Sequence, residues 1–195
     1  MPITINGSGT VTGLSAGGLP DGSITSDDIA AGAVTAAKLA AGAGGKILQV
    51  VSTTKTDKFA TNSTSYVDVT GLSVSITPSS VSNKILVIVN LSGASYTNTG
   101  GQWNLVRGST NIAVGTTSAA TRQVTGSFYN GQSESAYQSL FLHMTHLDSP
   151  STTSATTYKV QVRHDSSSYY LTINSRAADD YISSVSSITA MEVQG

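Results

Sequence analysis

The sequence predicts an all-β protein in which residues 46–195 form a jelly-roll-like sandwich of two sheets on a short N-terminal segment of different character. From Lys46 onward, β-branched residues alternate with polar residues, the pattern of half-buried strands. Turn-forming pairs such as Asn130-Gly131 interrupt the alternation at short intervals. No stretch has the periodicity of a long helix. We therefore expect residues 46–195, called the head, to be one domain.

Each strand of the head is expected where a run of alternating residues lies between two turns. Residues 85–89 are apolar on both faces, so their strand is expected at the centre of a sheet. In chain order, the expected strands are residues 46–53, 66–69, 72–77, 84–91, 102–107, 111–115, 122–129, 137–146, 157–164, 169–174 and 184–193.

The first 45 residues, called the leader, have a different composition. They contain no aromatic residue and ten glycines. Such a segment cannot bury enough apolar surface to offset its own ordering entropy, so it must fold on a partner. Residues 3–5 and 10–12 alternate like short strands and precede a turn-rich stretch, which predicts a docking segment over residues 1–20.

A short repeat fills most of the remaining leader. Residues 22–30 align with residues 32–40 at an offset of ten, and each copy suggests a glycine turn followed by a brief helical turn. Asp28 stands three residues after Thr25, as in a capping box, whereas Lys38 takes the equivalent place in the second copy.

Helical turns this short need tertiary packing. The simplest arrangement is a homotrimer in which three chains place Ile24, Ile29, Val34 and Leu39 on a common axis. Residues 21–45 are then a stalk that ends in a flexible hinge over residues 40–45.

Charge, hydropathy and cysteine content exclude several functional classes. The net charge is -1 and Lys and Arg are not clustered, so nucleic-acid binding is not expected. No apolar run could span a bilayer and no signal peptide begins the chain, so we expect neither membrane insertion nor signal-directed secretion. Zero cysteines suit assembly in a reducing cytosol. With charged residues at only 11%, the many hydroxyls suggest surface buried against identical copies.

Several short patterns resemble catalytic motifs but lack the required context. Residues 13–17 match a nucleophile pattern around Ser15, yet no helix can follow. Residues 40–47 resemble a phosphate loop without its hydroxyl residue or preceding strand. The adjacent carboxylates Asp27-Asp28 and Asp179-Asp180 cannot flank one glycosidic bond. We expect no catalytic residue and no cofactor.

Three histidines leave a second interpretation open. His143 and His146 have the spacing of neighbours on a helix, but flanking alternation favours a strand, which places them on opposite faces. We interpret them as ordinary strand histidines. The alternative is an axial ion held by one histidine from each of three chains, with His164 as a further candidate ligand.

Aromatic residues with polar neighbours predict a sugar-binding surface, because aromatic rings pack against pyranose faces. The alternative is that some rings fill the core or an interchain contact, which we expect for Trp103. The candidate receptor contacts are Tyr96, Asn98, Tyr129, Asn130, Tyr169 and Tyr170.

The leader resembles the N-terminal region of tail-fibre and other appendage proteins of tailed bacteriophages, particularly those of marine and freshwater bacteria, including cyanobacteria. The residues that carry the resemblance are 3–15 (ITINGSGTVTGLS), 18–25 (GLPDGSIT) and 33–40 (AVTAAKLA). The head looks like the C-terminal jelly-roll head of similar proteins through residues 157–163 (TYKVQVR) and 187–193 (SITAMEV).

The resemblance implies a homotrimer that is assembled in the host cytoplasm and becomes part of the virion. Residues 1–20 would attach to a phage tail or baseplate protein, and the head would face a host cell-surface glycan or outer-membrane component. This agrees with a non-enzymatic adhesion protein. The alternatives are a capsid-decoration or baseplate protein without receptor binding and, third, a small glycan hydrolase or esterase.

Overall fold

The computed structural model describes residues 24–35, 38–39, 46–96, 100–116, 123–129, 138–177 and 179–195. The chain divides into two compact units, Met1–Gly45 and Lys46–Gly195, which are the leader and the head. None of the helices in the described ranges has the length and apolar character of a bilayer-crossing segment.

In the leader, the first repeat copy forms one 3-10 turn, η1 (Ser26–Asp28). The Asp28 carboxylate accepts hydrogen bonds from the Thr25 backbone N–H at 2.9 Å and from the Thr25 hydroxyl at 2.8 Å. These two bonds lower the pKa of Asp28. In the second copy, the Lys38 ammonium donates to the Ala33 carbonyl at 3.0 Å. The acid and the base at equivalent positions therefore bond to opposite kinds of backbone group.

The predicted stalk residues Ile24, Ile29, Val34 and Leu39 are all exposed in the single chain, by 39 to 56%. A shared axis between copies would cover apolar side chains that are exposed at such a regular spacing. A single chain does not test the homotrimer, which stays a prediction. The predicted docking segment, residues 1–20, lies outside the described residues.

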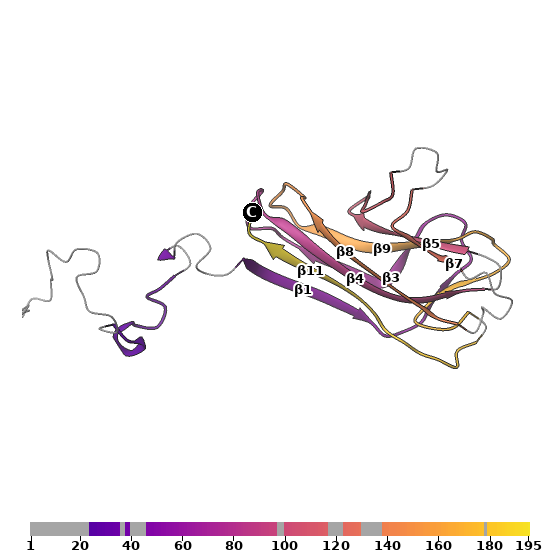
Figure 1. Ribbon diagram of the computed structural model, residues 1–195, viewed down its shortest axis with the longest axis horizontal. Coiled ribbons are helices and arrows are strands. Elements are labelled where there is room, and N and C mark those ends of the chain that lie inside the picture. The colour runs from indigo at the N-terminus through magenta and orange to yellow at the C-terminus, as the bar shows by residue number, and fades with distance from the viewer. Residues whose placement is uncertain are drawn as a thin grey trace, which may run out of the picture. The chain divides into compact units, whose positions relative to one another are not determined.

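The head is built from two antiparallel sheets (Figure 1). In the first sheet, β4 lies between β8 on one side and β11 and β10 on the other. β1 then pairs with β11, and β2 pairs with β10. The strands are β1 (Ile47–Lys55), β2 (Phe59–Thr61), β4 (Lys84–Ser95), β8 (Leu140–Asp148), β10 (Leu171–Ile173) and β11 (Ser186–Val193).

The second sheet has the order β3, β9, β5, with β6 and β7 both pairing to the free side of β5. Its strands are β3 (Val67–Ile76), β5 (Gly100–Arg107), β6 (Thr110–Ile112), β7 (Gly126–Tyr129) and β9 (Thr156–His164).

Both sheets contribute side chains to one apolar core, so the head is a β-sandwich, as the sequence predicted. β4 supplies Ile85, Val87 and Val89, each fully buried, which confirms its expected central place. The largest fully buried side chains come from the second sheet and are Trp103, Phe128 and Tyr158. Trp103 therefore belongs to the core rather than to the exposed surface.

Side chains of β1 close one side of the sandwich against β3. Gln49 Nε2 donates to the Thr77 carbonyl at 2.7 Å, and the Thr53 hydroxyl donates to the Ser73 carbonyl at 2.8 Å. These bonds occupy polar groups at the meeting edges of the two sheets, where unpaired groups would favour association with other strands.

The end of the head at which β1 begins is called the base. A buried carboxylate there accepts hydrogen bonds from several segments of the chain. Glu192 is 1% exposed and accepts hydrogen bonds from the Ser79 N–H at 2.6 Å, the Ser79 hydroxyl at 2.7 Å and Asn83 Nδ2 at 2.5 Å. Gln49 Nε2 donates to its second oxygen at 2.7 Å. Burial raises the pKa of Glu192, but the bonds from Asn83, Gln49 and Ser79 outweigh it and lower the pKa to about 2.

The strand predictions need three corrections. Residues 66–69 and 72–77 form the single strand β3, with a register shift between Asp68 and Ser73 and a positive φ of 80° at Gly71. The Thr70-Gly71 pair thus marks a bulge rather than a turn. β2 was not predicted, because three residues are too short for alternation to be visible.

The third correction is that β4 continues to Ser95, beyond the expected end at residue 91. Gly93 permits this extension, because a Cβ there would lie 2.8 Å from both a ring carbon of Phe128 and the Thr172 carbonyl oxygen. A glycine in a strand interior is therefore required by close approach, whereas by propensity it predicts the end of the strand.

Candidate functional site

The end of the head opposite the base, called the tip, is formed by the end of β4, the start of β5 and the β9–β10 connection. β4 ends at Ser95 and β9 ends at His164, while β5 begins at Gly100. The Asp165 N–H donates to the Gly100 carbonyl at 2.9 Å and joins the β9–β10 connection to the start of β5. Since β1 begins at the base, the first residues of the head lie at the end remote from the tip.

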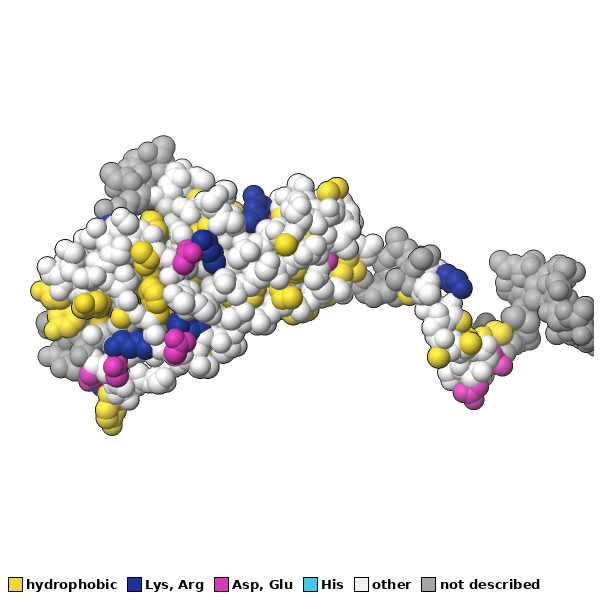
Figure 2. Space-filling model, turned by 180° about the vertical axis from the view of Figure 1, so that it is seen from behind, with side chains coloured by type: hydrophobic (Ala, Val, Ile, Leu, Met, Phe, Trp, Pro, Cys, Tyr) yellow, Lys and Arg dark blue, Asp and Glu magenta, His cyan; other side chains and the backbone are white. Residues whose placement is uncertain are grey.

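Two tyrosines stack on each other at the tip. The Tyr96 and Tyr169 rings have centroids 4.9 Å apart and an angle of 8° between their planes. Tyr96 is 37% and Tyr169 is 41% exposed, and the adjacent Tyr170 is 52% exposed. Figure 2 shows hydrophobic side chains gathered at this end of the head. The rings keep part of their aromatic surface exposed, and exposed aromatic surface is suited to the C–H face of a sugar ring.

A buried histidine holds the loop that carries Tyr169. His164 is fully buried, with its Nε2 3.1 Å from the Ser95 hydroxyl and its Nδ1 bonded to the backbone of Ser166. The backbone N–H of His164 donates to the Ser63 carbonyl at 2.8 Å. His164 therefore links the end of β4 to the β9–β10 loop.

Polar side chains border the tip on the outer face of the second sheet. Gln102 Nε2 donates to Asp165 Oδ1 at 3.1 Å, and its amide oxygen accepts from Arg163 Nη1 at 3.1 Å. The Arg163 guanidinium lies 6.0 Å from the centre of the Tyr66 ring. Amide, carboxylate and guanidinium groups provide the donors and acceptors that sugar hydroxyls require.

The structure brings together some of the predicted receptor contacts. Tyr96, Tyr169 and Tyr170 share the tip. Tyr129 is the last residue of β7 and its backbone pairs with Gly100, but its side chain lies outside the described residues. Asn98 and Asn130 also lie outside them.

The six candidates omitted Tyr181, which is 84% exposed on the β10–β11 loop. The Arg176 guanidinium lies 4.9 Å from the centre of its ring and forms two 2.9 Å hydrogen bonds to Asp179. Tyr181 takes no part in the Tyr96–Tyr169 stack, so it is an exposed tyrosine outside the stacked pair. Asp180 pairs with Lys58 rather than facing Asp179 across a cavity.

The histidines do not meet in the single chain. His143 is exposed and His146 is half-buried on the opposite face of β8, while His164 lies in the other sheet. Within the described ranges, no three His, Cys, Asp or Glu side chains are grouped to hold a metal ion. An ion shared between copies stays a hypothesis.

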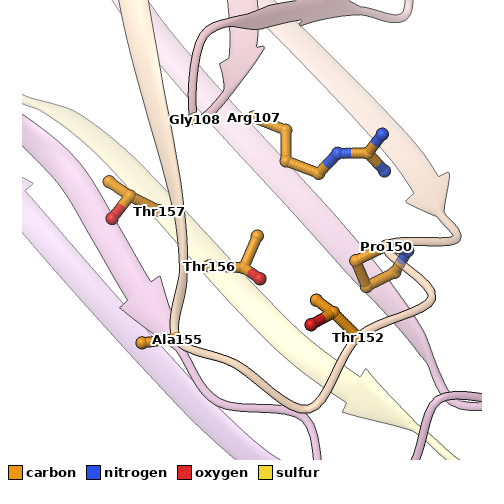
Figure 3. A pocket seen from close by; sticks show the side chains of 7 residues that line it. All are labelled: Arg107, Gly108, Pro150, Thr152, Ala155, Thr156 and Thr157. Carbon is orange, nitrogen blue, oxygen red and sulfur yellow. The ribbon is translucent and has the colours of Figure 1, made fainter.

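A pocket of about 320 Å³ opens at the base (Figure 3). Figure 3 shows the Arg107 side chain extending toward Pro150, with threonines across the pocket. Arg107 Nη1 bonds both oxygens of the buried Asp148 at 2.8 Å, and the Tyr158 hydroxyl donates to the same carboxylate at 2.6 Å. Burial, together with the Asp148 charge, raises the pKa of Tyr158 above its usual value. The charge of Arg107 is therefore already paired with a structural carboxylate.

The sequence matches no protein-family model and no curated protein. Among solved structures, the chain is similar to one titled "Structure of infectious bursal disease virus Gx strain", with 14% identity and a TM-score of 0.35. The alignment covers 75% of this chain and 42% of that one, so this chain spans less than half of the viral chain. A similarity of this extent says nothing about function.

Proposed function

We propose that this chain is a homotrimeric tail-fibre protein of a tailed bacteriophage, which binds a host-surface glycan through the tip of its head. The observation that carries the proposal is the exposed Tyr96–Tyr169 stack, which is held in place by the buried His164. Exposed aromatic rings that are fixed by buried polar contacts form a preorganised surface, and preorganisation lowers the entropic cost of binding.

The placement of the tip within the head supports an appendage. The head begins with β1 at the base, and the stacked tyrosines lie at the other end of the sandwich. A protein that is attached at one end is best placed to bind a cell surface with the other. Attachment through residues 1–20 to a tail or baseplate protein, and a location on the virion after assembly in the host cytoplasm, belong to the same proposal.

The leader supports the homotrimer through its exposed apolar residues Ile24, Ile29, Val34 and Leu39. Three heads on one stalk can convert weak sugar contacts into firm attachment, because the second and third contacts form at a high effective concentration. The two antiparallel sheets support a jelly-roll arrangement of the head.

A binding assay with the full-length chain tests this function. An array of bacterial surface polysaccharides is probed with the wild type, Tyr96→Ala, Tyr169→Ala and, as a matched control, Tyr181→Ala. Loss of one ring contact at the tip is expected to weaken each head about tenfold, with the folded state unchanged by circular dichroism. Equal binding by the wild type and both tip variants, or loss confined to Tyr181→Ala, would contradict the proposal.

The second candidate is a capsid-decoration or baseplate protein without receptor binding. It is favoured by the low charge of the head, whose surface shows few acidic or basic side chains (Figure 2). Electron microscopy of particles separates the two functions. A tip directed away from the particle supports adhesion, whereas a tip covered by neighbouring coat subunits supports the decoration protein.

A further inference from the structure

The outer face of the first sheet carries an unbroken apolar row across four strands. Val50 of β1 pairs with Met191 of β11, Met191 pairs with Leu86 of β4, and Leu86 pairs with Leu147 of β8. Val50 is 54% and Leu147 is 50% exposed at the two ends of the row. The neighbouring residues 85 and 190 are fully buried, so the row points away from the core.

Further apolar residues extend the row toward the base and the centre of the sheet. Leu48 is 45% exposed at the start of β1, and Ile88 lies in the next row between Thr189 and Thr145. The rows nearer the tip carry mainly hydroxyl and amide side chains, together with His143 and, beyond it on β8, Phe141, which is 73% exposed. On these four strands, Lys84 at the base is the one lysine or arginine on the outer face, and no acidic residue lies there. We call Leu48, Val50, Leu86, Ile88, Leu147 and Met191 the apolar face.

The outer face of the second sheet has the opposite character. Lys159 forms a 2.8 Å ion pair with Asp68, and Gln161 donates to the same carboxylate at 2.7 Å. These two bonds, the ion pair first, lower the pKa of Asp68. Burial of such groups against another protein would cost desolvation energy, so this face is suited to solvent.

We propose that the apolar face is where copies of the head pack against each other around the axis of the trimer. The inference rests on the proposed function, because it takes the homotrimer from there. Identical copies around an axis bring like side chains together near that axis, where like charges would repel each other, and the residues of the apolar face carry no charge. Its first residues, Leu48 and Val50, follow soon after the leader in the sequence. The exposed apolar residues of the leader would be covered by the same copies of the chain.

The size of the face fits a contact that the leader reinforces. Four strands about 4.8 Å apart and eight residues at about 3.3 Å each give the whole outer face of these strands a flat area of roughly 500 Å², of which the apolar face is only a part. A typical stable interface buries about 800 Å² per partner. The head contact alone is therefore smaller than a stable interface requires, and the leader supplies the remainder.

Cross-linking of the full-length chain tests the proposal directly, because the protein has no cysteine of its own. Val50→Cys, Leu86→Cys and Leu147→Cys each introduce one thiol on the apolar face, and Ser75→Cys introduces one on the outer face of the second sheet. With a short bis-maleimide, at least one of the first three is expected to give covalent dimers between copies, and Ser75→Cys none. Cross-linking that is equal for Ser75→Cys, or absent from all three apolar positions, overturns the inference.

Light scattering supplies the second measurement. The wild type is expected at three times 19.9 kDa. Val50→Lys with Leu147→Lys should raise the concentration at which the trimer dissociates at least tenfold, whereas Thr70→Lys with Ser75→Lys should not. A monomeric wild type, or a mass gained only on mixing with phage particles, overturns packing between copies. Polysaccharide binding by the Tyr169→Ala protein and the wild type is scored separately, so the two proposals can fail independently.

Discussion

Replacement of Glu192 by glutamine should remove a part of the acid sensitivity of the head. The carboxylate is almost fully buried and accepts four hydrogen bonds, which lower its pKa from 4.5 to about 2. Each tenfold change in proton affinity is worth about 1.4 kcal/mol, so the ionised carboxylate contributes roughly 3 kcal/mol of stability at neutral pH. Since the folded state binds this proton more weakly than the unfolded state, that contribution is complete above pH 4.5 and is lost as the pH falls toward 2.

The Glu192→Gln variant cannot ionise, and its amide group places donors opposite the donors of Ser79 and Asn83. Urea unfolding followed by circular dichroism, at intervals from pH 7 to pH 2.5, should show the variant less stable than the wild type by about 2 to 3 kcal/mol at pH 7. The difference should shrink as the pH falls below 4.5. Measurements in 0.5 M NaCl screen the exposed carboxylates at the surface. If the difference in the free energy of unfolding between the two proteins stays constant with pH, the hydrogen bonds to Glu192 do not stabilise an ionised carboxylate.

Three further substitutions test other parts of the head. Gly93→Ala should destabilise it by about 1 to 3 kcal/mol in thermal or urea unfolding, because the new Cβ would meet the Thr172 carbonyl oxygen at 2.8 Å; an unchanged midpoint would show that the strands can separate locally. Tyr158→Phe should lower the free energy of unfolding by about 1.5 to 3 kcal/mol, since it removes the hydrogen bond to the buried Asp148 carboxylate; a smaller loss would mean that the remaining bonds to this carboxylate suffice. His164→Ala should speed amide hydrogen exchange in residues 165–170 more than in the β4 core, and uniform exchange rates would refute its role in holding the loop.

Local patterns predicted the sandwich well, because alternation reports which face of a strand is buried. Ile85, Val87 and Val89 could be assigned to a central strand from their neighbours alone. The bulge at Gly71 could not be separated from a turn, since both favour a glycine with positive φ. The difference is decided by pairing with β9, which is remote in sequence.

The tip was predicted in composition but not in geometry. Tyr96 and Tyr169 were both candidates, yet their stacking depends on the order of strands that brings two distant loops to one end. The buried Glu192 network was not foreseen, because a lone acid near the end of a strand gives no sign that Ser79 and Asn83 will surround it. Long-range topology decided both features.

The anchoring of the tip loops separates the exposed tyrosines of the tip from the residues that hold the fold together. The loop on which Tyr169 and Tyr170 lie is held by the His164 ring, while both tyrosines stand outside the apolar core. Exchange of these surface side chains leaves the frame and its anchors intact. If the head binds a host surface as proposed, a lineage could change hosts by altering a few tip residues while the sandwich beneath them persists, and a protein engineer could use the same division to graft new specificities onto the head.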